Sequence, residues 1–421
     1  MNYVFEGKKI VILGGTPQHC KIVNAAKELG VYTIVIDYLK DSPAKKISDK
    51  SYLVDIKDVK KITEICKNEN VDGIISGYID PCQRPYNELC NRLGLFCYGT
   101  KDQFYKMTDK HAFKKMCMEN NVDTIKEYTE EDVINNKVEY PVFVKPVDSR
   151  GSRGQSVCYN KTELINAIEN AKKESSNNDF IIEKYIKNGN EFQVTYFFVN
   201  GEPYLLRTTD SYQGLEKNHL EKVVACAVSP SRFTDLFLKN ANENVIKMFK
   251  KLGIKNGPIF MQGFEDNGKF RFFDPGLRFP GVDYEKIYKK VFNIDLMKEM
   301  IYIAITGKCS NVILPKDGVF LNGQYAAIYF PTVKAGIINK IDGISNITTR
   351  EDVISYLPRC SVNDEILWTY NVNQRFAEID VLSKNKEELK DTINEIQKAL
   401  DIRDINNNDM KYELFDVNRI I

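Results

Sequence analysis

The first hundred residues alternate between short apolar runs and helical stretches, and this alternation constrains the fold more than any other feature. The apolar runs lie at residues 8–13, 31–36, 52–54, 71–75 and 95–97. The first run ends in Gly14-Gly15 and the second ends at Asp37. Strands that alternate with helices at this spacing build a parallel sheet. The sequence therefore predicts a Rossmann-like α/β unit that closes near Gly99.

Beyond residue 100 the pattern changes to mixed α and β segments. We predict helices at residues 101–121, 161–173, 235–252, 284–306 and 385–400. Strands are predicted at 142–145, 156–158, 180–182, 192–199, 204–206 and 374–383, with a β-rich stretch at 324–347. A hairpin is expected around Asp266-Asn267-Gly268, a strong turn signal. Boundaries near 100 and 310 predict three modules, 1–100, 101–310 and a small β-rich 311–421, and the second carries a mobile lid at about 113–187.

Composition excludes several classes of protein. Lys plus Arg is 59 and Asp plus Glu is 58, which gives a net charge of +1. The chain therefore lacks the excess of positive charge that is typical of proteins that bind nucleic acid or an anionic membrane. No apolar run approaches 18 residues, so nothing is expected to span a bilayer. The ten Cys show no CxxC spacing and are interpreted as reduced thiols of a cytoplasmic protein. Only three His are present, which argues against a His-rich metal site.

The first turn, Gly14-Gly15-Thr16-Pro17, is a weak signal on its own. Glycines after a first strand let a ligand approach a helix N-terminus. The turn is neither G-x-G-x-x-G nor a Walker loop, and a plain strand-to-helix turn explains it as well. Asp37 ends the second strand, as a nicotinamide enzyme would require, so that hypothesis stays open here.

Three later patterns could carry chemistry. Lys145 ends a strand before the Gly/Ser/Arg loop 149–154, whose backbone amides and arginines suit phosphate, although a solvated hairpin tip is the alternative. Glu183-Lys184-Tyr185-Ile186, followed by Glu191, could read an adenine edge and a ribose, or form an ordinary strand. Cross-strand pairing could join Gln262 to Asp274 as oxygen ligands of Mg²⁺, with Arg278 as a nearby cation; a structural Asp-Pro-Gly turn is the alternative.

The order of these patterns resembles the ATP-grasp superfamily. It runs from Thr108-Asp109-Lys110 through Lys145 and its loop, Glu183 to Glu191, Lys222-Val-Val, and Gln262 to Arg278. Biotin carboxylase and the carbamoyl-phosphate synthetase large chain look closest in pattern. The stretch from Thr332 to Gly343, with Gln374-Arg375-Phe-Ala, is similar to a carboxylase-type end domain. The resemblance covers almost the whole chain and implies an ATP-grasp domain between a Rossmann-like and a C-terminal domain.

The resemblance implies a role for each matching residue. Lys110 and Lys145 would contact nucleotide phosphates, and Ser152, Arg153 and Gly154 would close over them. Adenine would meet the hinge, and ribose would meet Glu191. Lys222 would act near the transferred phosphate, with His219 beside it, and Arg278 would be the active-site arginine. Gln262 and Asp274 would hold Mg²⁺ or Mn²⁺. The hinge residues implied to bind ATP in this way are Glu183, Lys184, Tyr185 and Ile186.

One departure concerns the metal site. The family pattern Glu-x-Asn-x-Arg is replaced by Asp274-Pro-Gly276-Leu-Arg278. Asp is one methylene shorter than Glu, and Gly276 removes an expected ligand, which water could replace. The alternative is a weakened or lost metal site, which would leave an ATP- or ADP-binding protein without ligase turnover.

The resemblance implies an ADP-forming ligase that phosphorylates a carboxylate and joins it to an amine. No biotinyl motif is present, so the chain is not expected to carry biotin, and a carbamoyl-phosphate product is not expected from one synthetase-like half. Candidate substrate selectors follow the fourth strand, with Arg375 as a further candidate; the alternative is a helix-capping loop. A homodimer is one assembly that the resemblance allows. The selectors after the fourth strand are Tyr78, Asp80, Gln83 and Arg84.

Overall fold

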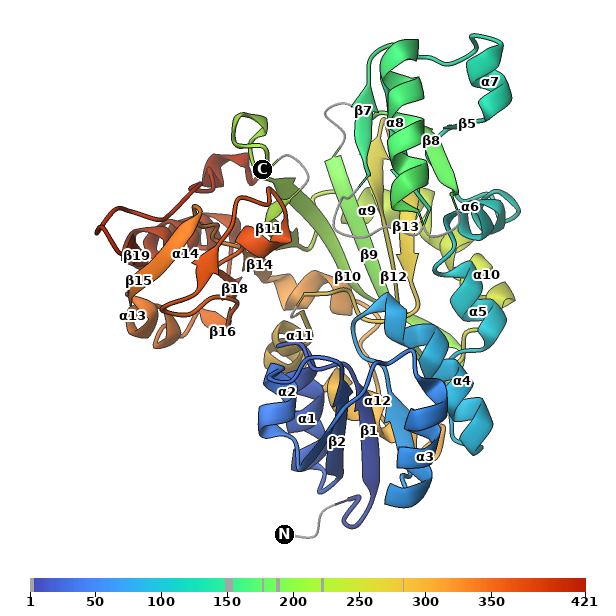
Figure 1. The fold of residues 1–421 in the computed structure, drawn as a ribbon, viewed down its shortest axis with the longest axis vertical. Coiled ribbons are helices and arrows are strands. Elements are labelled where there is room, and N and C mark those ends of the chain that lie inside the picture. The colour runs from blue at the N-terminus through green and yellow to red at the C-terminus, as the bar shows by residue number, and fades with distance from the viewer. Residues whose placement is uncertain (1–3, 148–153, 176–177, 187–189, 221–222, 283) are drawn as a thin grey trace.

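The computed structural model describes residues 4–147, 154–175, 178–186, 190–220, 223–282 and 284–421. Within this part of the chain the buried apolar residues form a large core, a second core in the C-terminal module and a small core of the lid. Figure 1 shows the N-terminal domain at the bottom, the lid at the top and the C-terminal module to one side.

The N-terminal domain is a four-stranded parallel sheet in the order β3-β2-β1-β4. Residues 10–13 of β1 are buried, as expected for a parallel sheet covered on both faces. The predicted Rossmann-like unit is therefore confirmed. Its elements are β1 (Lys9–Leu13), α1 (His19–Glu28), β2 (Tyr32–Asp37), α2 (Pro43–Ile47), β3 (Lys50–Leu53), α3 (Val59–Glu69), β4 (Gly73–Ile75) and α4 (Gln83–Leu93).

Two short helices lead from this domain to the lid. In α6 the apolar side chains Phe113, Met116 and Cys117 belong to the large core, not to the core of the lid. The lid is an antiparallel sheet in the order β5-β8-β6-β7, and its own core lies within residues 128–182. The elements are α5 (Lys101–Lys106), α6 (Lys110–Met118), β5 (Glu127–Tyr128), α7 (Glu130–Ile134), β6 (Val142–Pro146), β7 (Ser156–Cys158), α8 (Lys161–Glu174) and β8 (Phe180–Lys184).

The central sheet has eight strands in the order β13-β12-β9-β10-β11-β14-β18-β16. It continues without a break across residue 310, because β11 pairs with β14. The predicted hairpin is present, and Asn267 and Gly268 both have positive φ at its turn. The strands are β9 (Asn190–Val199), β10 (Glu202–Gln213), β11 (Val224–Ser229), β12 (Gly257–Asp266), β13 (Lys269–Gly276), β14 (Tyr325–Tyr329), β16 (Val353–Pro358) and β18 (Ala377–Ser383).

Three stretches predicted as continuous helices are interrupted. The stretch 101–121 divides between Lys106 and Lys110 into α5 and α6. The stretch 235–252 divides at Ala241, whose φ is −133°, and the stretch 284–306 divides before Asp295, which caps the following helix. The C-terminal module adds a three-stranded sheet, β17-β15-β19. The remaining elements are α9 (Thr234–Asn240), α10 (Asn242–Leu252), α11 (Tyr284–Phe292), α12 (Leu296–Thr306), β15 (Gly336–Asp342), α13 (Ile344–Thr348), β17 (Glu365–Ile366), α14 (Lys386–Ala399) and β19 (Asp401–Asp404).

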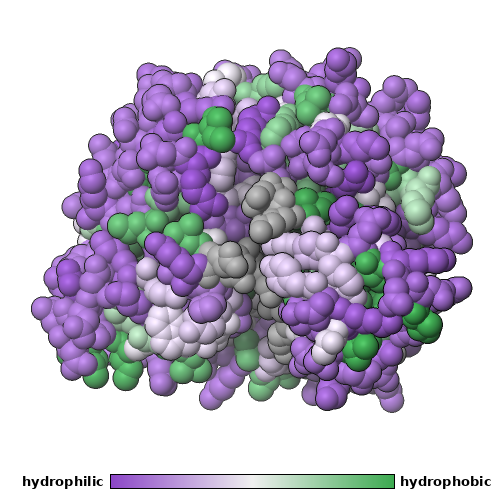
Figure 2. Space-filling model, turned by 90° about the horizontal axis from the view of Figure 1, so that it is seen from above, coloured by the Kyte–Doolittle hydropathy of each residue, from purple (hydrophilic) through white to green (hydrophobic). Residues whose placement is uncertain are grey.

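The surface is mostly polar. In Figure 2, hydrophobic residues on the face seen from above occur in small separated groups among hydrophilic ones. Among the residues placed in the structure, no helix combines the length and the apolar character needed to cross a membrane.

Candidate active site

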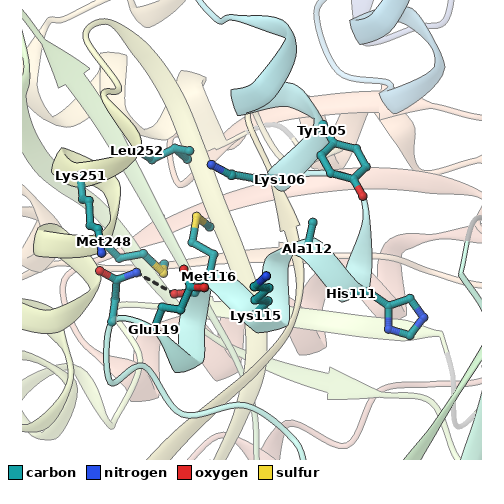
Figure 3. Close-up of a pocket in the computed structure, with 11 residues that line it drawn as sticks. Tyr105, Lys106, His111, Ala112, Lys115, Met116, Glu119, Met248, Lys251 and Leu252 are labelled. Carbon is teal, nitrogen blue, oxygen red and sulfur yellow. Dashed lines mark hydrogen bonds between the residues drawn. The ribbon is translucent and has the colours of Figure 1, made fainter.

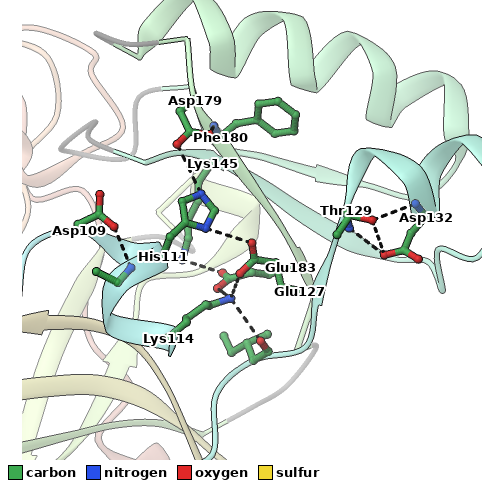
Figure 4. Close-up of polar contacts among 12 residues, drawn as sticks. Asp109, His111, Lys114, Glu127, Thr129, Asp132, Lys145, Asp179, Phe180 and Glu183 are labelled. Atoms are coloured by element: carbon green, nitrogen blue, oxygen red, sulfur yellow. Dashed lines mark hydrogen bonds and ion pairs between the residues drawn. The ribbon is translucent and has the colours of Figure 1, made fainter. Parts of the chain in front are cut away.

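Two buried lysines share one carboxylate where the lid meets α6. Glu183 Oε2 lies 2.6 Å from Lys145 Nζ, and Glu183 Oε1 lies 2.5 Å from Lys114 Nζ. Lys114 also reaches Glu127 Oε2 at 3.1 Å. Figure 4 shows the three side chains converging from β6, β8 and α6. The cluster thus joins the predicted phosphate lysine Lys145 to the predicted hinge residue Glu183.

Strand register explains why these charges are buried together. Phe143 of β6 pairs with Glu183 of β8, and Lys145 pairs with Ile181, so Lys145 and Glu183 share one face of the lid sheet. Burial lowers the pKa of Lys145. It would raise the pKa of Glu183, but the charges of Lys145 and Lys114 more than offset burial and keep that pKa below its usual value. The two lysines therefore stabilise the charged form of the Glu183 carboxylate.

Arg278 pairs with a carboxylate from the N-terminal domain. Its Nε donates to Asp80 Oδ1 at 2.5 Å and its Nη2 donates to Asp80 Oδ2 at 2.7 Å. The guanidinium also lies 5.0 Å from the centre of the Phe260 ring. The planar Arg278 guanidinium therefore has the geometry to bind a carboxylate through two hydrogen bonds.

Gln262 and Asp274 face each other across β12 and β13, as predicted. The Gln262 amide nitrogen donates to Gln193 at 3.2 Å, so its amide oxygen is the atom that could serve a metal. Lys110 Nζ lies 3.9 Å from Asp274 Oδ1. Burial raises the pKa of Asp274, which also feels the charges of Lys110, Asp80, Lys145 and Arg278. These groups therefore form one electrostatic neighbourhood.

A phenyl ring fills the position where the family pattern has a third ligand. Phe260 pairs directly with Gly276 across the hairpin. A Cβ added to Gly276 would lie 2.2 Å from Phe260 Cε1 and 2.7 Å from Cζ. Residues two apart on a strand share a face, so the ring stands beside Gln262 on the side that carries the two oxygen ligands. A side chain at residue 276 is therefore excluded by the ring.

The residues present still fit one Mg²⁺, which takes few protein ligands and keeps several waters. In the described part of the chain, no group of three or more His, Cys, Asp or Glu side chains is arranged to hold a metal ion. Gln262 and Asp274 could contribute two oxygens, and bound phosphates and water would complete the shell.

The predicted ribose partner, Glu191, lies near the start of β9. Its side chain accepts a hydrogen bond from the Gln213 amide. Burial raises the pKa of Glu191 to about 7, although Gln213 and Arg375 act in the opposite direction. Arg375 donates to the carbonyl oxygen of Val224 at 2.8 Å, and burial lowers its pKa to about 10. Its Nε is buried without a hydrogen-bond partner among the described residues.

The hinge places its side chains alternately. Glu183 is buried, whereas Lys184 is exposed and its Nζ lies 3.5 Å from Glu139 on the lid. The backbone amides of Lys184 and Tyr185 donate to the carbonyl oxygens of Lys126 and Pro141.

The predicted loop residues are placed only in part. Ser152, Arg153 and Lys222 lie outside the described residues. Gly154 has φ +69°, and a Cβ there would meet Pro146 Cγ at 2.8 Å. His219 is exposed with φ +57°, and its ring lies 5.2 Å from that of Tyr370.

Two of the four predicted substrate selectors are buried. Tyr78 is 3% exposed and its hydroxyl donates to Met297 Sδ, whereas Gln83 is 1% exposed and donates to the carbonyl oxygen of Leu277. Tyr78 thus contacts α12, and Gln83 contacts the residue that precedes Arg278. Arg84 is exposed on the first turn of α4. Of the four, Asp80 is the one that contacts a predicted catalytic residue.

The turn after β1 is packed against the side chains of Asp37 and His19. Asp37 accepts hydrogen bonds from the amides of Gly15 and Leu39, and it is 5% exposed. The His19 ring lies 2.8 Å from where a Cβ of Gly14 would be, and burial lowers the pKa of His19 to about 4. Because Asp37 is committed to the backbone, the geometry disfavours the nicotinamide hypothesis.

A separate groove lies between α5, α6 and α10, with a volume of about 590 Å³. Figure 3 shows Lys106, Lys115 and Lys251 around an apolar floor that includes Met116 and Met248. The described residues that line it include none of the predicted site residues.

Lys114 and His111 also lie at the site, although neither was predicted from the sequence. Lys114 follows Lys110 by four residues, so both lie on one face of a helix that opens at the Asp-Lys motif. That spacing was a signal for a second cation. The contacts of Lys114 with Glu127 and Glu183 depend on lid strands that come later in the chain.

Two parts of the chain match known protein families. Residues 138–271 match the family model of the ATP-grasp domain, and residues 10–84 match that of the PylC-like, N-terminal domain. The chain is 23% identical over 320 residues to the 2-oxoglutarate carboxylase small subunit of Hydrogenobacter thermophilus, covering 70% of this chain and 66% of that protein. It is 26% identical over 282 residues to a formate-dependent phosphoribosylglycinamide formyltransferase of Sulfurisphaera tokodaii, covering 59% and 65%. The chain thus spans less than two thirds of either relative.

Solved structures share the fold over nearly the whole chain. The biotin carboxylase domain dimer of Hydrogenobacter thermophilus 2-oxoglutarate carboxylase, in complex with MgADP, has a TM-score of 0.78 at 20% identity and covers 96% of this chain and 91% of that one. L-amino acid ligase from Bacillus licheniformis has a TM-score of 0.76 at 17% identity and covers 95% and 99%. The predicted mixed α/β fold with an ATP-grasp domain is confirmed.

Proposed function

Because the chain contains an ATP-grasp domain, we propose that it is an ATP-dependent ligase that joins a carboxylate to an amine. A carboxylate oxygen attacks the γ-phosphorus of ATP, ADP leaves, and an acyl phosphate forms. The amine nitrogen then attacks the acyl carbon, phosphate leaves, and the nitrogen loses a proton. The observation that carries the proposal is the convergence of Lys110, Lys145, Asp274 and Arg278, with Gln262 opposite Asp274, in one neighbourhood.

The cations in this neighbourhood suit phosphoryl transfer, in which the protein mainly positions groups and offsets charge. Lys110 and Lys145 would bind nucleotide phosphates, and Lys222 and Arg278 would act near the transferred phosphoryl group. Mg²⁺, held by Gln262 and Asp274, would neutralise negative charge on the phosphates. The loop with Ser152, Arg153 and Gly154 would exclude water, which otherwise hydrolyses an acyl phosphate.

Two arginines indicate that the substrates carry acidic groups. Arg278 already binds the Asp80 carboxylate in two hydrogen bonds, so a substrate carboxylate could take that place. Arg375 is a buried cation with an Nε that lacks a partner among the described residues. We infer that at least one substrate carries a second anionic group. The named relatives are a 2-oxoglutarate carboxylase subunit and a formate-dependent phosphoribosylglycinamide formyltransferase, and a similar structure is an L-amino acid ligase.

The setting of the enzyme is also part of the proposal. We propose a cytoplasmic enzyme, in line with its reduced thiols, and a homodimer, which the dimeric biotin carboxylase domain supports.

A second candidate function is nucleotide binding without ligase turnover. The specific observation in its favour is the Phe260 ring beside Gly276, which takes up the space of a third metal ligand. A protein of this kind would bind ATP or ADP with little dependence on Mg²⁺.

The test combines binding and turnover on one preparation. Isothermal titration of ATP, with and without Mg²⁺, is followed by an ADP-release assay across pooled carboxylates and amines, in which Arg278→Lys serves as a control. ADP release that requires Mg²⁺ and rises with a substrate pool would support the ligase. Tight ATP binding without ADP release in any pool would refute it and support the second candidate.

A further inference from the structure

The two lysines on Glu183 contact different oxygens of its carboxylate, so Glu183 keeps a counter-ion if either lysine moves away. We propose that Lys114 is a positioning residue: it supplies Glu183 with a counter-ion, so that Lys145 is released to bind the nucleotide phosphates. This inference rests on the proposed nucleotide site.

The contacts of Lys114 suit this role. Its side chain is 4% exposed, and its Nζ lies 2.5 Å from Glu183, 3.1 Å from Glu127 and 3.3 Å from the carbonyl oxygen of Ile125. Glu127 and Glu183 are direct cross-strand partners in the lid sheet. Like charges placed opposite each other on neighbouring strands are destabilising. Lys114 lies against both and so offsets their repulsion from outside the sheet.

Burial makes a counter-ion for Glu183 necessary. Glu183 is 1% exposed, and a buried carboxylate that loses its counter-ion is strongly penalised. With Lys114 present, Lys145 can turn from Glu183 to a phosphate and leave Glu183 paired. Without Lys114, the same movement would strand a buried charge, so Glu183 would retain Lys145 and nucleotide affinity would fall.

His111 extends the cluster toward solvent. Its Nδ1 lies 3.4 Å from Glu127 and its Nε2 lies 3.5 Å from Asp179, and both carboxylates belong to the lid (Figure 4). Asp109, the N-cap of α6, also faces it, and Lys106 and Lys115 line the groove that it borders. The hydrogen bond to Glu127 and the nearby carboxylates raise the pKa of His111 despite partial burial. When protonated, His111 shares Glu127 with Lys114 and leaves Lys114 more fully to Glu183.

The test measures binding of magnesium ADP, which cannot be turned over, to the full-length protein by isothermal titration. Lys114→Met is expected to weaken binding at least tenfold, or about 1.4 kcal/mol. Lys114→Arg, which keeps the charge, should stay within threefold of the original affinity. The matched control is Lys172→Met, which breaks a surface ion pair with Glu130 inside the lid and should change nothing.

A double variant separates positioning from direct contact with the nucleotide. In Lys114→Met with Glu183→Gln, no carboxylate remains to hold Lys145, so affinity should recover to within threefold of the original. If Lys114→Met does not fold, Lys114→Gln takes its place, with the same expected loss of affinity. No loss in Lys114→Met, or no recovery in the double variant, would overturn the inference.

The pH profile provides a second readout. Affinity in the unaltered protein should fall severalfold as pH rises through the pKa of His111, and the ratio to His111→Gln removes the titration of ADP itself. A ratio that is constant between pH 5.5 and 8.5 would overturn the contribution of His111. If the unaltered protein does not bind magnesium ADP at all, both the proposed nucleotide site and the inference are refuted. If it binds magnesium ADP and Lys114→Met binds equally well, only the inference is refuted.

Discussion

Replacing Gly276 should reveal how firmly the Phe260 ring closes the third ligand position. Gly276 does not have positive φ, so alanine there meets no backbone strain, and the cost arises from the ring alone. The new Cβ would lie 2.2 Å from Phe260 Cε1, whereas carbon atoms pack at about 3.5–4.0 Å. Phe260 is 3% exposed and supports the Arg278 guanidinium, so it has little room to move.

The expected magnitude follows from overpacking. Gly276→Ala should lower the free energy of unfolding by about 1–3 kcal/mol. Once Phe260→Ala has removed the ring, adding Gly276→Ala should cost nothing further. The two substitutions should therefore show a coupling energy of about 1–3 kcal/mol, within the range for residues in contact.

The assay is urea unfolding followed by far-UV circular dichroism on the four proteins of this double-mutant cycle. Additive effects of the two substitutions would refute the reasoning, as would a Gly276→Ala cost below about 0.5 kcal/mol, the range of ordinary surface changes. A further arm adds Gly276→Asn to Phe260→Ala. This combination places an amide on the face that carries Asp274 and should strengthen the Mg²⁺ dependence of ATP binding, whereas Gly276→Asn alone should not.

Three further outcomes are expected. Lys145→Ala should weaken ATP binding at least a hundredfold in isothermal titration, and an unchanged affinity would remove Lys145 from the phosphate site. Arg278→Lys should lower substrate-dependent ADP release at least a hundredfold but change ATP affinity less than threefold, because a lysine cannot replace a two-pronged contact; equal losses in both assays would count against a substrate role. Burial raises the pKa of Glu191 to about 7, so the folded state holds this proton more tightly than the unfolded state does. The free energy of unfolding should therefore fall as pH rises from about 4.5 to 7. Glu191→Gln should therefore gain about 1–3 kcal/mol over the unaltered protein at pH 8 and little at pH 4, as measured by urea unfolding.

Local patterns were enough to predict the N-terminal sheet and the β12–β13 hairpin. Both depend on signals that neighbouring residues carry: continuous apolar runs in one case, and the Asn267-Gly268 turn in the other. The pairing of Gln262 with Asp274 depends on more than the turn. The register set at the turn would place Gln262 opposite residue 273, and a register shift between Gln262 and Gly263 brings Asp274 there instead.

The contacts that complete the candidate site could not be predicted in this way. Asp80 and Arg278 are 198 residues apart, and nothing near either residue specifies the other. The aromatic ring at Phe260 looked like an ordinary strand residue until the register placed it opposite Gly276. Asp295 is a residue type that favours the N-cap of a helix, so it signalled that a new helix begins there. The prediction of one helix at 284–306 did not take this signal into account.

The unbroken central sheet limits how this protein can be cut or recombined. A truncation at residue 310 would remove β14 and leave β11 with a row of unpaired backbone groups. Such an exposed edge is a template for aggregation. The lid differs, because it has its own sheet and its own core, and it could be exchanged for that of a relative without opening the central sheet. Chimeras should therefore join within the lid connections, and never between β11 and β14.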